Sequence, residues 1–496
     1  MSVAETPLLV VPEIRSPYDR AMPNISAAAV SASLGIAPLV LDLNWQPEEE
    51  VLSFITRSKA QLILFTCMID NYGSAIDIAQ KIRSAHPSAK LVVGGPHVTL
   101  LASAGGKIDP VFDVVVVGEA EAIPSHGFVT TESSGEKQQI ISAAGVKPLL
   151  SPSSWAGALP NWSAAFREHH LPLFMLEGSR GCPFHCQFCS HSDLAGVVLR
   201  TKPTEQILRE MTIAELQFGV CHFRFTDSDL TSPGSRFIDI CEAITDNNWA
   251  RKPEWVAFAR IGDLDPVKVG LAREAGCIGL FVGIESAKTS TLRDLRKIYD
   301  RNRAKETIKA ARDQGLLIFA NYMFGLPRDA SSDWELIVED VLDLGFQSAN
   351  ANPFYLSPNS EYARAMHGWG IRLVDELWLD HFHKVFSEGL EYFRTEEMTQ
   401  AEMQTGVRKI RSALLQNGIL WNLRDYHLLA WRSVGGASEA LYKIWNNPEL
   451  TLGGEELYAV QEMRSRGTHK DKFASAAGFK NGLTRASDIC RHEGLW

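Results

Sequence analysis

Residues 180–191 read RGCPFHCQFCSH, and three cysteines stand in them at the spacing CxxxCxxC. Cys182, Cys186 and Cys189 therefore lie within eight positions of a chain that has eight cysteines among its 496 residues. In a reducing compartment, clustered cysteines more often bind a metal or act in catalysis than form disulfides. We therefore expect a metal site in this stretch, with the three thiolates as its ligands.

The number of ligands separates two kinds of metal site. A structural zinc ion takes four tetrahedral ligands, usually from two CxxC pairs, so His185 or His191 would have to complete the set. A cubane iron–sulfur cluster bound by only three thiolates has one iron open to a substrate or cofactor. The single CxxC pair favours the cluster, and zinc is the alternative.

The other five cysteines are scattered along the chain, and most of them stand in apolar contexts. Free cysteine behaves as a small hydrophobic residue and is often buried. We expect these five to be packing residues: Cys67, Cys221, Cys241, Cys277 and Cys490.

The cysteine stretch follows the first of six strands that we expect between residues 172 and 356. The strands are predicted at 172–179, 222–229, 254–260, 278–286, 316–326 and 348–355, with helical patterns between them. Six βα units form either a partial barrel of the TIM type or an open sheet, and in both the loops after the strands gather reacting groups. The position of the cysteines therefore predicts that the chemistry belongs to this part of the chain.

A second alternation of strands and helices covers residues 7–123. Its apolar strands and amphipathic helices predict a Rossmann-like open parallel sheet covered on both faces. Ligands of such sheets bind beyond the carboxyl ends of the strands, where the loops GGPH (Gly94–His97) and GEAE (Gly118–Glu121) are expected. The absence of GxGxxG and GxxxxGK[ST] motifs argues against a dinucleotide site or a P-loop.

These patterns divide the chain into four segments. Residues 1–125 form the first α/β domain, 126–170 a linker rich in serine, proline and glycine, 171–357 the second α/β domain and 358–496 a helical domain. Half of the twelve tryptophans lie beyond residue 360. They indicate either the core of a small helical domain or a cap that binds substrate.

Charge and hydropathy bear on the partners of the chain. A formal net charge of −10 argues against a nucleic-acid partner, because phosphate binding leaves a basic footprint. The first residues show no signal peptide, and the longest apolar runs are far shorter than the ~20 residues of a membrane span. We expect a cytoplasmic protein that does not enter a membrane.

The cysteine stretch, at the end of the first strand of a six-unit α/β domain, resembles the radical S-adenosylmethionine superfamily. The resemblance implies a [4Fe–4S] cluster on the three cysteines, with S-adenosylmethionine on the open iron. It also implies reductive formation of a 5′-deoxyadenosyl radical, with electrons from a flavodoxin- or ferredoxin-type donor. His185 and His191 are then expected to be bystanders.

The same resemblance assigns S-adenosylmethionine contacts to the later strand ends. Phe188 would pack near the adenine, Arg260 would pair with the carboxylate, and Glu285 in VGIES would bind the ribose. FTDSD (Phe225–Asp229) lacks the family's glycines, so the role of Asp227 there stays open. An arginine at a strand end and a core aromatic are the plainer interpretations of Arg260 and Phe188.

Residues 7–356 together resemble the cobalamin-binding radical S-adenosylmethionine enzymes. The resemblance implies cobalamin contacts in the two glycine-containing loops, at Gly94, Gly95, Pro96, His97, Gly118 and Glu119. The DxHxxG motif that donates an axial histidine is absent. Either cobalamin would bind without a histidine ligand, or the domain is vestigial and has lost the cofactor.

Three functions follow, in order of preference. The first is a cobalamin-dependent radical methyltransferase that methylates an unactivated carbon of a small molecule, in natural-product or cofactor biosynthesis by analogy. The second is a radical dehydratase, epimerase or ring-rearranging enzyme with an accessory or vestigial cobalamin domain. The third is a non-catalytic sensor with zinc at the cysteines.

Overall fold

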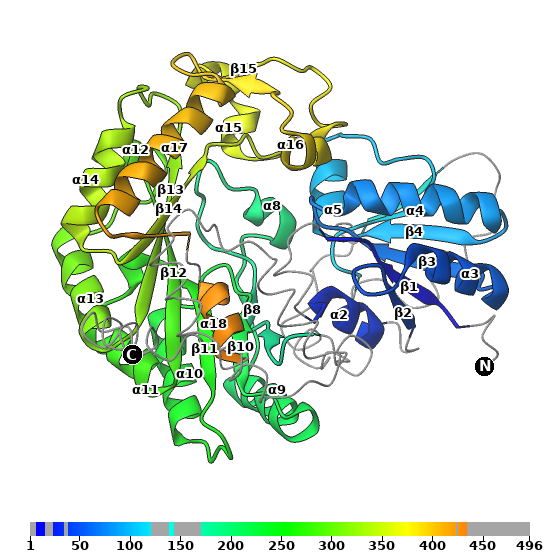
Figure 1. The fold of residues 1–496 in the computed structure, drawn as a ribbon, viewed down its shortest axis with the longest axis horizontal. Coiled ribbons are helices and arrows are strands. Elements are labelled where there is room, and N and C mark those ends of the chain that lie inside the picture. Colours follow the sequence, from blue (N-terminus) through cyan, green and yellow to red (C-terminus); the bar gives the residue numbers. More distant parts are fainter. Residues whose placement is uncertain are drawn as a thin grey trace, which may run out of the picture.

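The computed structural model describes residues 6–14, 23–33, 38–120, 138–142, 170–422 and 425–433. They build two parallel sheets that lie side by side, the N-terminal one with its helices at the right of Figure 1 and the second at the left. Helix α8 (His191–Ala195), from the cysteine stretch, lies between them. The α/β class expected from the sequence is thus confirmed for both sheets.

The N-terminal sheet has the strand order β2-β1-β3-β4-β5-β6, and every pair is parallel. Its strands are β1 (Leu8–Val11), β2 (Leu39–Asp42), β3 (Leu62–Thr66), β4 (Lys90–Gly94), β5 (Val114–Val117) and β6 (Gln139–Ser142). The helices are α2 (Ile25–Ser33), α3 (Glu48–Ser58), α4 (Tyr72–Ala85) and α5 (Pro96–Ser103). Strand β6 lies within the stretch predicted to be a linker, and the sequence analysis did not anticipate it.

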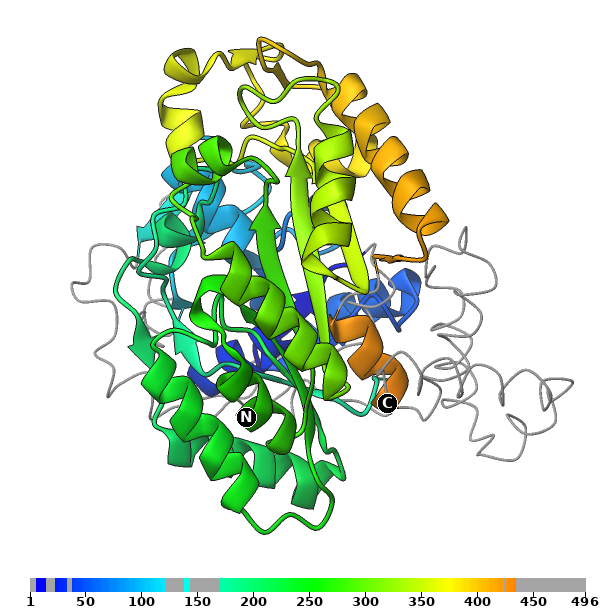
Figure 2. The ribbon, with the colours of Figure 1, turned by 90° about the vertical axis from the view of Figure 1, so that its left-hand side faces the viewer.

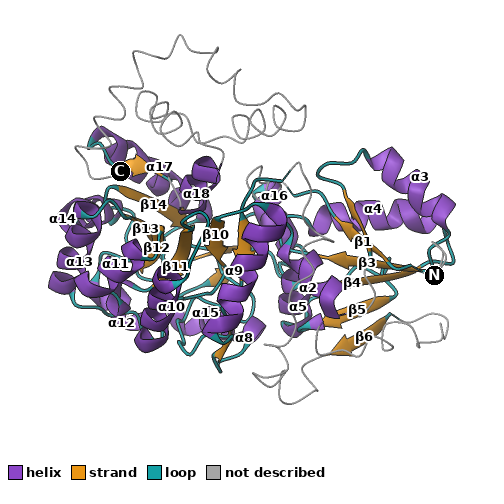
Figure 3. Ribbon diagram, turned by 90° about the horizontal axis from the view of Figure 1, so that it is seen from below, coloured by secondary structure: helices purple, strands orange, loops and turns teal. Residues whose placement is uncertain are grey.

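The two faces of this sheet belong to different cores. Leu8 and Val10 pack with residues of α3 and α4, which cover one face (Figure 3), whereas Leu9 and Val11 pack with a cluster that continues into the second sheet. Successive strand residues point to opposite faces, so a continuous apolar run such as LLVV serves both cores. The second face, with α2 on it, therefore abuts the other domain.

The second sheet has the order β17-β14-β13-β12-β11-β10-β7, again parallel throughout. Six strands match the predicted ones: β7 (Phe174–Leu176), β10 (His222–Phe225), β11 (Glu254–Ala259), β12 (Cys277–Glu285), β13 (Leu317–Phe324) and β14 (Ser348–Pro353). The intervening helices are α9 (Thr204–Phe218), α10 (Gly234–Asp246), α11 (Pro266–Glu274), α12 (Thr289–Asp294), α13 (Arg301–Asp313) and α14 (Trp334–Leu344). Figure 2 shows these strands running in one direction, so their carboxyl ends meet at one edge.

The described residues between 358 and 433 are mainly helical, with three two-residue strands among the helices. The helices are α15 (Glu361–Arg364), α16 (Phe382–Glu388), α17 (Gln400–Gln416) and α18 (Asp425–Ser433), and the strands are β15 (Arg372–Leu373), β16 (Phe393–Arg394) and β17 (Leu420–Trp421). Trp378 stacks on Tyr392 and is 6% exposed, which agrees with core packing for this tryptophan. Lys107 donates its backbone N–H to Asp380, which ties this region to the N-terminal sheet.

Within the described residues, no helix combines the length and the apolar character that crossing a membrane requires. Cys490, the tail beyond residue 433 and most of the predicted linker lie outside the described residues.

Candidate active site between the two sheets

The three cysteines lie on a loop that runs from β8 (Ser179–Arg180) to α8, at the carboxyl edge of the second sheet. The loop is closed by backbone hydrogen bonds from Cys182 to Gly196 and from Cys189 to Cys186. Gly181 makes this turn possible, because it has φ of +91° and a Cβ there would lie 2.3 Å from the carbonyl oxygen of Val198. The glycine of RGC is therefore a requirement of the loop itself.

The thiols of this loop are free and half-buried. Burial raises the pKa of Cys182 and raises that of Cys189 to about 11, so the neutral thiols are favoured when no metal is near. Metal ligation needs thiolates, so a bound cationic centre would supply the compensating charge. Among the described residues no three His, Cys, Asp or Glu side chains gather round a point that a single ion could occupy. Three free thiols on one loop fit a cluster in which each thiolate takes a different iron.

The two histidines that could have completed a zinc site are engaged elsewhere or exposed. His191 Nε2 lies 2.5 Å from the hydroxyl of Ser228, and the His185 side chain is exposed at the surface. The residues present therefore fit a metal group held by three thiolates, without a histidine ligand.

Arg260 reaches the cysteine loop from the end of β11. Its guanidinium lies 3.6 Å from the centre of the Phe184 ring, and Nη1 lies 3.9 Å from the sulfur of Cys186. Stacking on an aromatic ring holds a guanidinium in one orientation. A positive charge is thus held beside the cysteines, where a carboxylate ligand could pair with it.

Glu285 ends β12 at a point where the strand is irregular. The register shifts between Gly283 and Glu285, and Glu285 has φ of +71°, a conformation that side-chain-bearing residues rarely adopt. Glu285 is only 5% exposed, and its carboxylate lies 2.5 Å from Lys297 Nζ. A Cβ on Gly283 would lie 2.0 Å from this carboxylate, so VGIES needs its glycine to make room for the ion pair.

Phe188 completes this group on the cysteine loop. It is partly buried, and Lys297 Nζ lies 5.9 Å from the centre of its ring. The structure thus brings Phe188, Lys297 and Glu285 together beside the cysteines.

Asp227 does not take part in this group. It is 1% exposed, and its carboxylate accepts hydrogen bonds from the Gly178 N–H at 2.9 Å and the Ser179 hydroxyl at 2.5 Å. The side chain therefore ties the end of β10 to the start of β8 instead of facing a ligand. Asp229 is the carboxylate nearer the cysteines: burial, with Asp263 nearby, raises its pKa to about 6, and Oδ2 has no hydrogen-bond partner.

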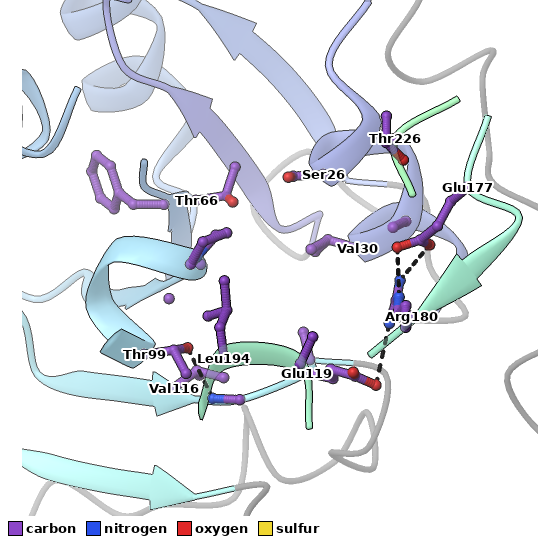
Figure 4. Close-up of a pocket in the computed structure, with 18 of the residues that line it drawn as sticks. Ser26, Val30, Thr66, Thr99, Val116, Glu119, Glu177, Arg180, Leu194 and Thr226 are labelled. Carbon is purple, nitrogen blue, oxygen red and sulfur yellow. Dashed lines mark hydrogen bonds and ion pairs between the residues drawn. The ribbon is translucent and has the colours of Figure 1, made fainter. Parts of the chain in front are cut away.

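A cavity of about 280 Å³ opens between the two sheets (Figure 4). From the N-terminal sheet it is lined by the ends of β1, β3, β4 and β5 and by small residues of α2, such as Ser26 and Val30. From the other side it is lined by the cysteine loop region, including Arg180, His191 and Leu194. Its walls are mostly apolar with a few polar groups, the usual character of a small-molecule or cofactor site.

Both glycine-containing loops lie on this cavity. Gly95 has φ of +104°, and a Cβ there would lie 2.7 Å from the backbone N and O of Cys67. Gly118 has φ of +99°, and its N–H donates to the hydroxyl of Thr99 at 3.0 Å. Because no side chains project from these turns, a flat ligand can approach the backbone closely. Gly94 and Pro96 line the cavity with them, so these four predicted contacts fit the edge of a corrin ring.

Glu119 lies at the rim of the cavity, but its carboxylate already has partners. It accepts hydrogen bonds from both terminal nitrogens of Arg200, at 2.8 and 2.5 Å, and lies 3.3 Å from Arg180 (Figure 4). Burial alone would raise the pKa of Glu119, yet these arginines hold it below its ordinary value. Arg180 also binds Glu177, and Arg200 donates to the carbonyl of Ala195, so an ion network joins GEAE to the start of the cysteine loop and to the end of α8.

His97 does not line the cavity, contrary to the expectation of a loop contact with cobalamin. It is 4% exposed in α5, and its ring packs on Tyr72 and stacks on Phe382. Burial, with His383 nearby, lowers the pKa of His97 to about 3, so the ring stays neutral. His97 belongs to the contact between the N-terminal sheet and α16.

Two residues of the site were not foreseen. Arg180 and Lys297 carry no motif signal that separates them from surface side chains, and His191, expected to be a bystander, lines the cavity. Arg180 stands two positions before Cys182, and this proximity is the one signal that could have identified it.

Comparison with known proteins supports the same division of the chain. Residues 18–125 match a family model described as a B12 binding domain, and residues 176–341 match one described as the radical SAM superfamily. The first match covers the glycine-containing loops, and the second covers the cysteine loop, Arg260 and Glu285.

Among curated proteins, an uncharacterized methyltransferase of Pyrococcus horikoshii is 25% identical over 335 residues, covering 64% of this chain and 72% of that protein. The anaerobic magnesium-protoporphyrin IX monomethyl ester cyclase of Rubrivivax gelatinosus is 23% identical over 324 residues, covering 61% of this chain and 58% of the cyclase.

Among solved structures, the radical S-adenosylmethionine methyltransferase TsrM from Kitasatospora setae, with cobalamin and a [4Fe–4S] cluster bound, is similar with a TM-score of 0.63. The match is 15% identical and covers 88% of this chain and all of TsrM. This likeness shows that the two chains share a fold.

Proposed function

Because the chain belongs to the cobalamin-dependent radical SAM methyltransferases, we propose that it methylates an unactivated carbon of a small molecule, of the kind found in natural-product or cofactor biosynthesis. One observation carries the proposal: β8 and α8, which flank the cysteine loop on either side, line the same cavity as the two glycine-containing loops. Such a carbon offers no leaving group or acidic proton, so radical chemistry and a methyl carrier have to act on one bound substrate.

The chain's cofactors are a [4Fe–4S] cluster, S-adenosylmethionine and cobalamin. Cys182, Cys186 and Cys189 would hold the cluster, and the turns at Gly95 and Gly118 would receive the cobalamin. When bound, the cluster and S-adenosylmethionine supply a hydrogen-abstracting radical, and cobalamin supplies the methyl carrier. The protein's part is to place these groups on either side of one substrate.

The side chains near the cysteines fit the polar ends of S-adenosylmethionine. Arg260 offers a positive charge to a carboxylate, and Glu285, with Lys297 beside its carboxylate, offers acceptors to ribose hydroxyls. Phe188 offers a ring face to the adenine. The unpaired Oδ2 of Asp229 offers an acceptor to an ammonium group in the same region.

Part of the cavity wall is apolar. Leu64, Val92 and Val116 from the N-terminal sheet and Leu194 from α8 line it. An apolar enclosure protects a carbon radical from side reactions and strengthens the charge interactions at its edge. The substrate would be a small molecule. A second TsrM structure holds such a substrate, tryptophan. We place the reaction in the cytoplasm, with a flavodoxin- or ferredoxin-type electron donor.

The test is anaerobic reconstitution of the full chain with iron, sulfide and cobalamin, followed by metal analysis. We expect about four iron atoms and one cobalamin per chain, with 5′-deoxyadenosine and S-adenosylhomocysteine both formed from S-adenosylmethionine under reducing conditions. Cys182→Ala should lose the iron and the deoxyadenosine, whereas the control Cys241→Ala should keep both. Deoxyadenosine without S-adenosylhomocysteine would replace methylation with a radical rearrangement, and a protein that binds no iron would refute both.

A further inference from the structure

The amino edge of the second sheet, opposite the cysteine loop, carries another cluster of reactive side chains. Cys221 and His222 stand at the start of β10, and Glu254 stands at the start of β11, the strand beside it (Figure 1). A cavity of about 800 Å³ opens here, and all three residues line it. Cys221 was expected to be a buried packing residue; it is indeed only 9% exposed, and it also lines this cavity.

The three side chains form a chain of polar contacts. The sulfur of Cys221 lies 3.7 Å from His222 Nδ1, and His222 Nε2 lies 3.5 Å from a carboxylate oxygen of Glu254. Arg432 of α18 donates to both oxygens of Glu254, through Nε at 2.9 Å and through Nη2. A thiol beside an imidazole whose other nitrogen faces a carboxylate is the arrangement that favours a thiolate.

The net electrostatic effect lowers the pKa of the Cys221 thiol, although the Glu254 carboxylate opposes it. Burial alone would raise the pKa of the Cys221 thiol, but the hydrogen bond with His222 and the nearby Arg251 lower it. Burial alone would lower the pKa of His222, but Cys221 and Glu254 raise it. Cys241, which is buried with no such partner, shows the contrast, because burial raises its pKa to about 12.

The rim of the cavity is positively charged. Besides the Glu254–Arg432 pair, it carries Arg251, Lys252 and Arg273 against one further acidic group, Glu274. Arg251 and Lys252 are exposed. Such a rim attracts a small anion and disfavours a cation, most strongly at low ionic strength.

We propose that Cys221 is a site of reversible thiol modification, which forms a mixed disulfide with a low-molecular-weight disulfide that carries carboxylates. The Cys221 thiolate attacks one sulfur of the disulfide, the sulfur–sulfur bond of the reagent breaks, and one half leaves as a thiolate that takes a proton. Cys221 is oxidised, the leaving half is reduced, and a free thiol reverses the exchange. The site lies away from the cofactors and does not depend on the function proposed for them.

The test uses the full, cluster-loaded protein at low salt, with 5,5′-dithiobis(2-nitrobenzoate) as a disulfide with two carboxylates. Peptide mass mapping gives the modification rate of Cys221 between pH 5.5 and 9. We expect a midpoint below the ~8.5 of an ordinary thiol. His222→Gln should lower the rate at pH 6.5 by about tenfold or more and restore it at pH 9, where the thiolate forms without help.

A second measurement tests the effect of the positively charged rim on the modification rate of Cys221. Cystamine, a disulfide with two positive charges, should react with Cys221 about tenfold more slowly than the anionic reagent, and Arg251→Gln with Lys252→Gln should narrow this difference. Cys241→Ala serves as the control that leaves both rates at Cys221 unchanged. An unmodified Cys221, a midpoint at or above 8.5, or equal rates with the two reagents would overturn the proposal; none of these results depends on a variant folding.

Discussion

The ion network around Glu119 gives the sharpest prediction of stability. Glu119→Gln keeps the shape of the side chain but removes the charge that Arg180 and Arg200 face. The side chains of Glu119 and Arg200 are only 11% and 4% exposed, so Arg200 would keep a buried charge without a counter-ion. Removing one partner of a buried ion pair costs about 3–5 kcal/mol. We expect a loss near 3 kcal/mol, because Arg180 keeps Glu177.

The assay is chemical unfolding of the two proteins at pH 7 and at lower pH. The folded-state pKa of Glu119 is lowered, so its stabilising effect is present above its unfolded pKa and is lost as the pH falls through the folded pKa. The difference between the proteins should therefore shrink below about pH 4. Glu361→Gln is the matched control, because its ion pair with Arg296 is half exposed and worth about 0–1 kcal/mol. Equal losses for the two variants would refute the assignment of a buried interdomain network.

Three further predictions concern the cofactor contacts. Gly95→Ala should lower the cobalamin content of the reconstituted protein by about tenfold or more, since its Cβ would collide with backbone. The control is Gly105→Ala, a glycine that also has a positive φ but has open space around it, and this variant should keep its cobalamin. Equal losses of cobalamin in the two variants would point to backbone strain alone. Glu285→Gln should raise the KM for S-adenosylmethionine about tenfold while iron content stays the same, and an unchanged KM would remove it from that site. Asp227→Asn should destabilise the fold by about 2 kcal/mol through its lost charged hydrogen bonds without raising that KM; a raised KM with normal stability would restore it as a ligand contact.

Much of the fold could be predicted because its signals are local. Most predicted strands of the second sheet are short apolar runs bounded by turn residues, and all six occur in the structure within a few residues of the expected ends. The cysteine loop could be recognised for the same reason, since its three thiols and Gly181 are neighbours in sequence. Strand β6 escaped prediction because QIIS is brief and mostly exposed, so no hydrophobic period marks it.

The directions of the side chains at the site could not be predicted, for one physical reason. Asp227 and Asp229 differ by two positions, yet Asp227 accepts hydrogen bonds from Gly178 and Ser179, whereas Asp229 lies near enough to Cys182 to affect its pKa. His97 stands beside Gly95 and Pro96 in GGPH, yet α5 turns its ring away from the cavity. A motif identifies the loop that carries a group, whereas the direction of each side chain depends on what packs against it.

The sequence by itself determined which elements form and which loops carry chemistry, because strand periodicity, turn glycines and the cysteine spacing act over a few residues. Only the tertiary structure decided how these loops meet. The pairing of Glu119 with Arg200, 81 positions apart, and of Cys221 with His222 and Glu254 across two strands, depends on sheet order and helix packing. Such contacts join residues that are distant along the chain. The sequence around a charged side chain at a strand end does not indicate which partner it will contact in the folded protein.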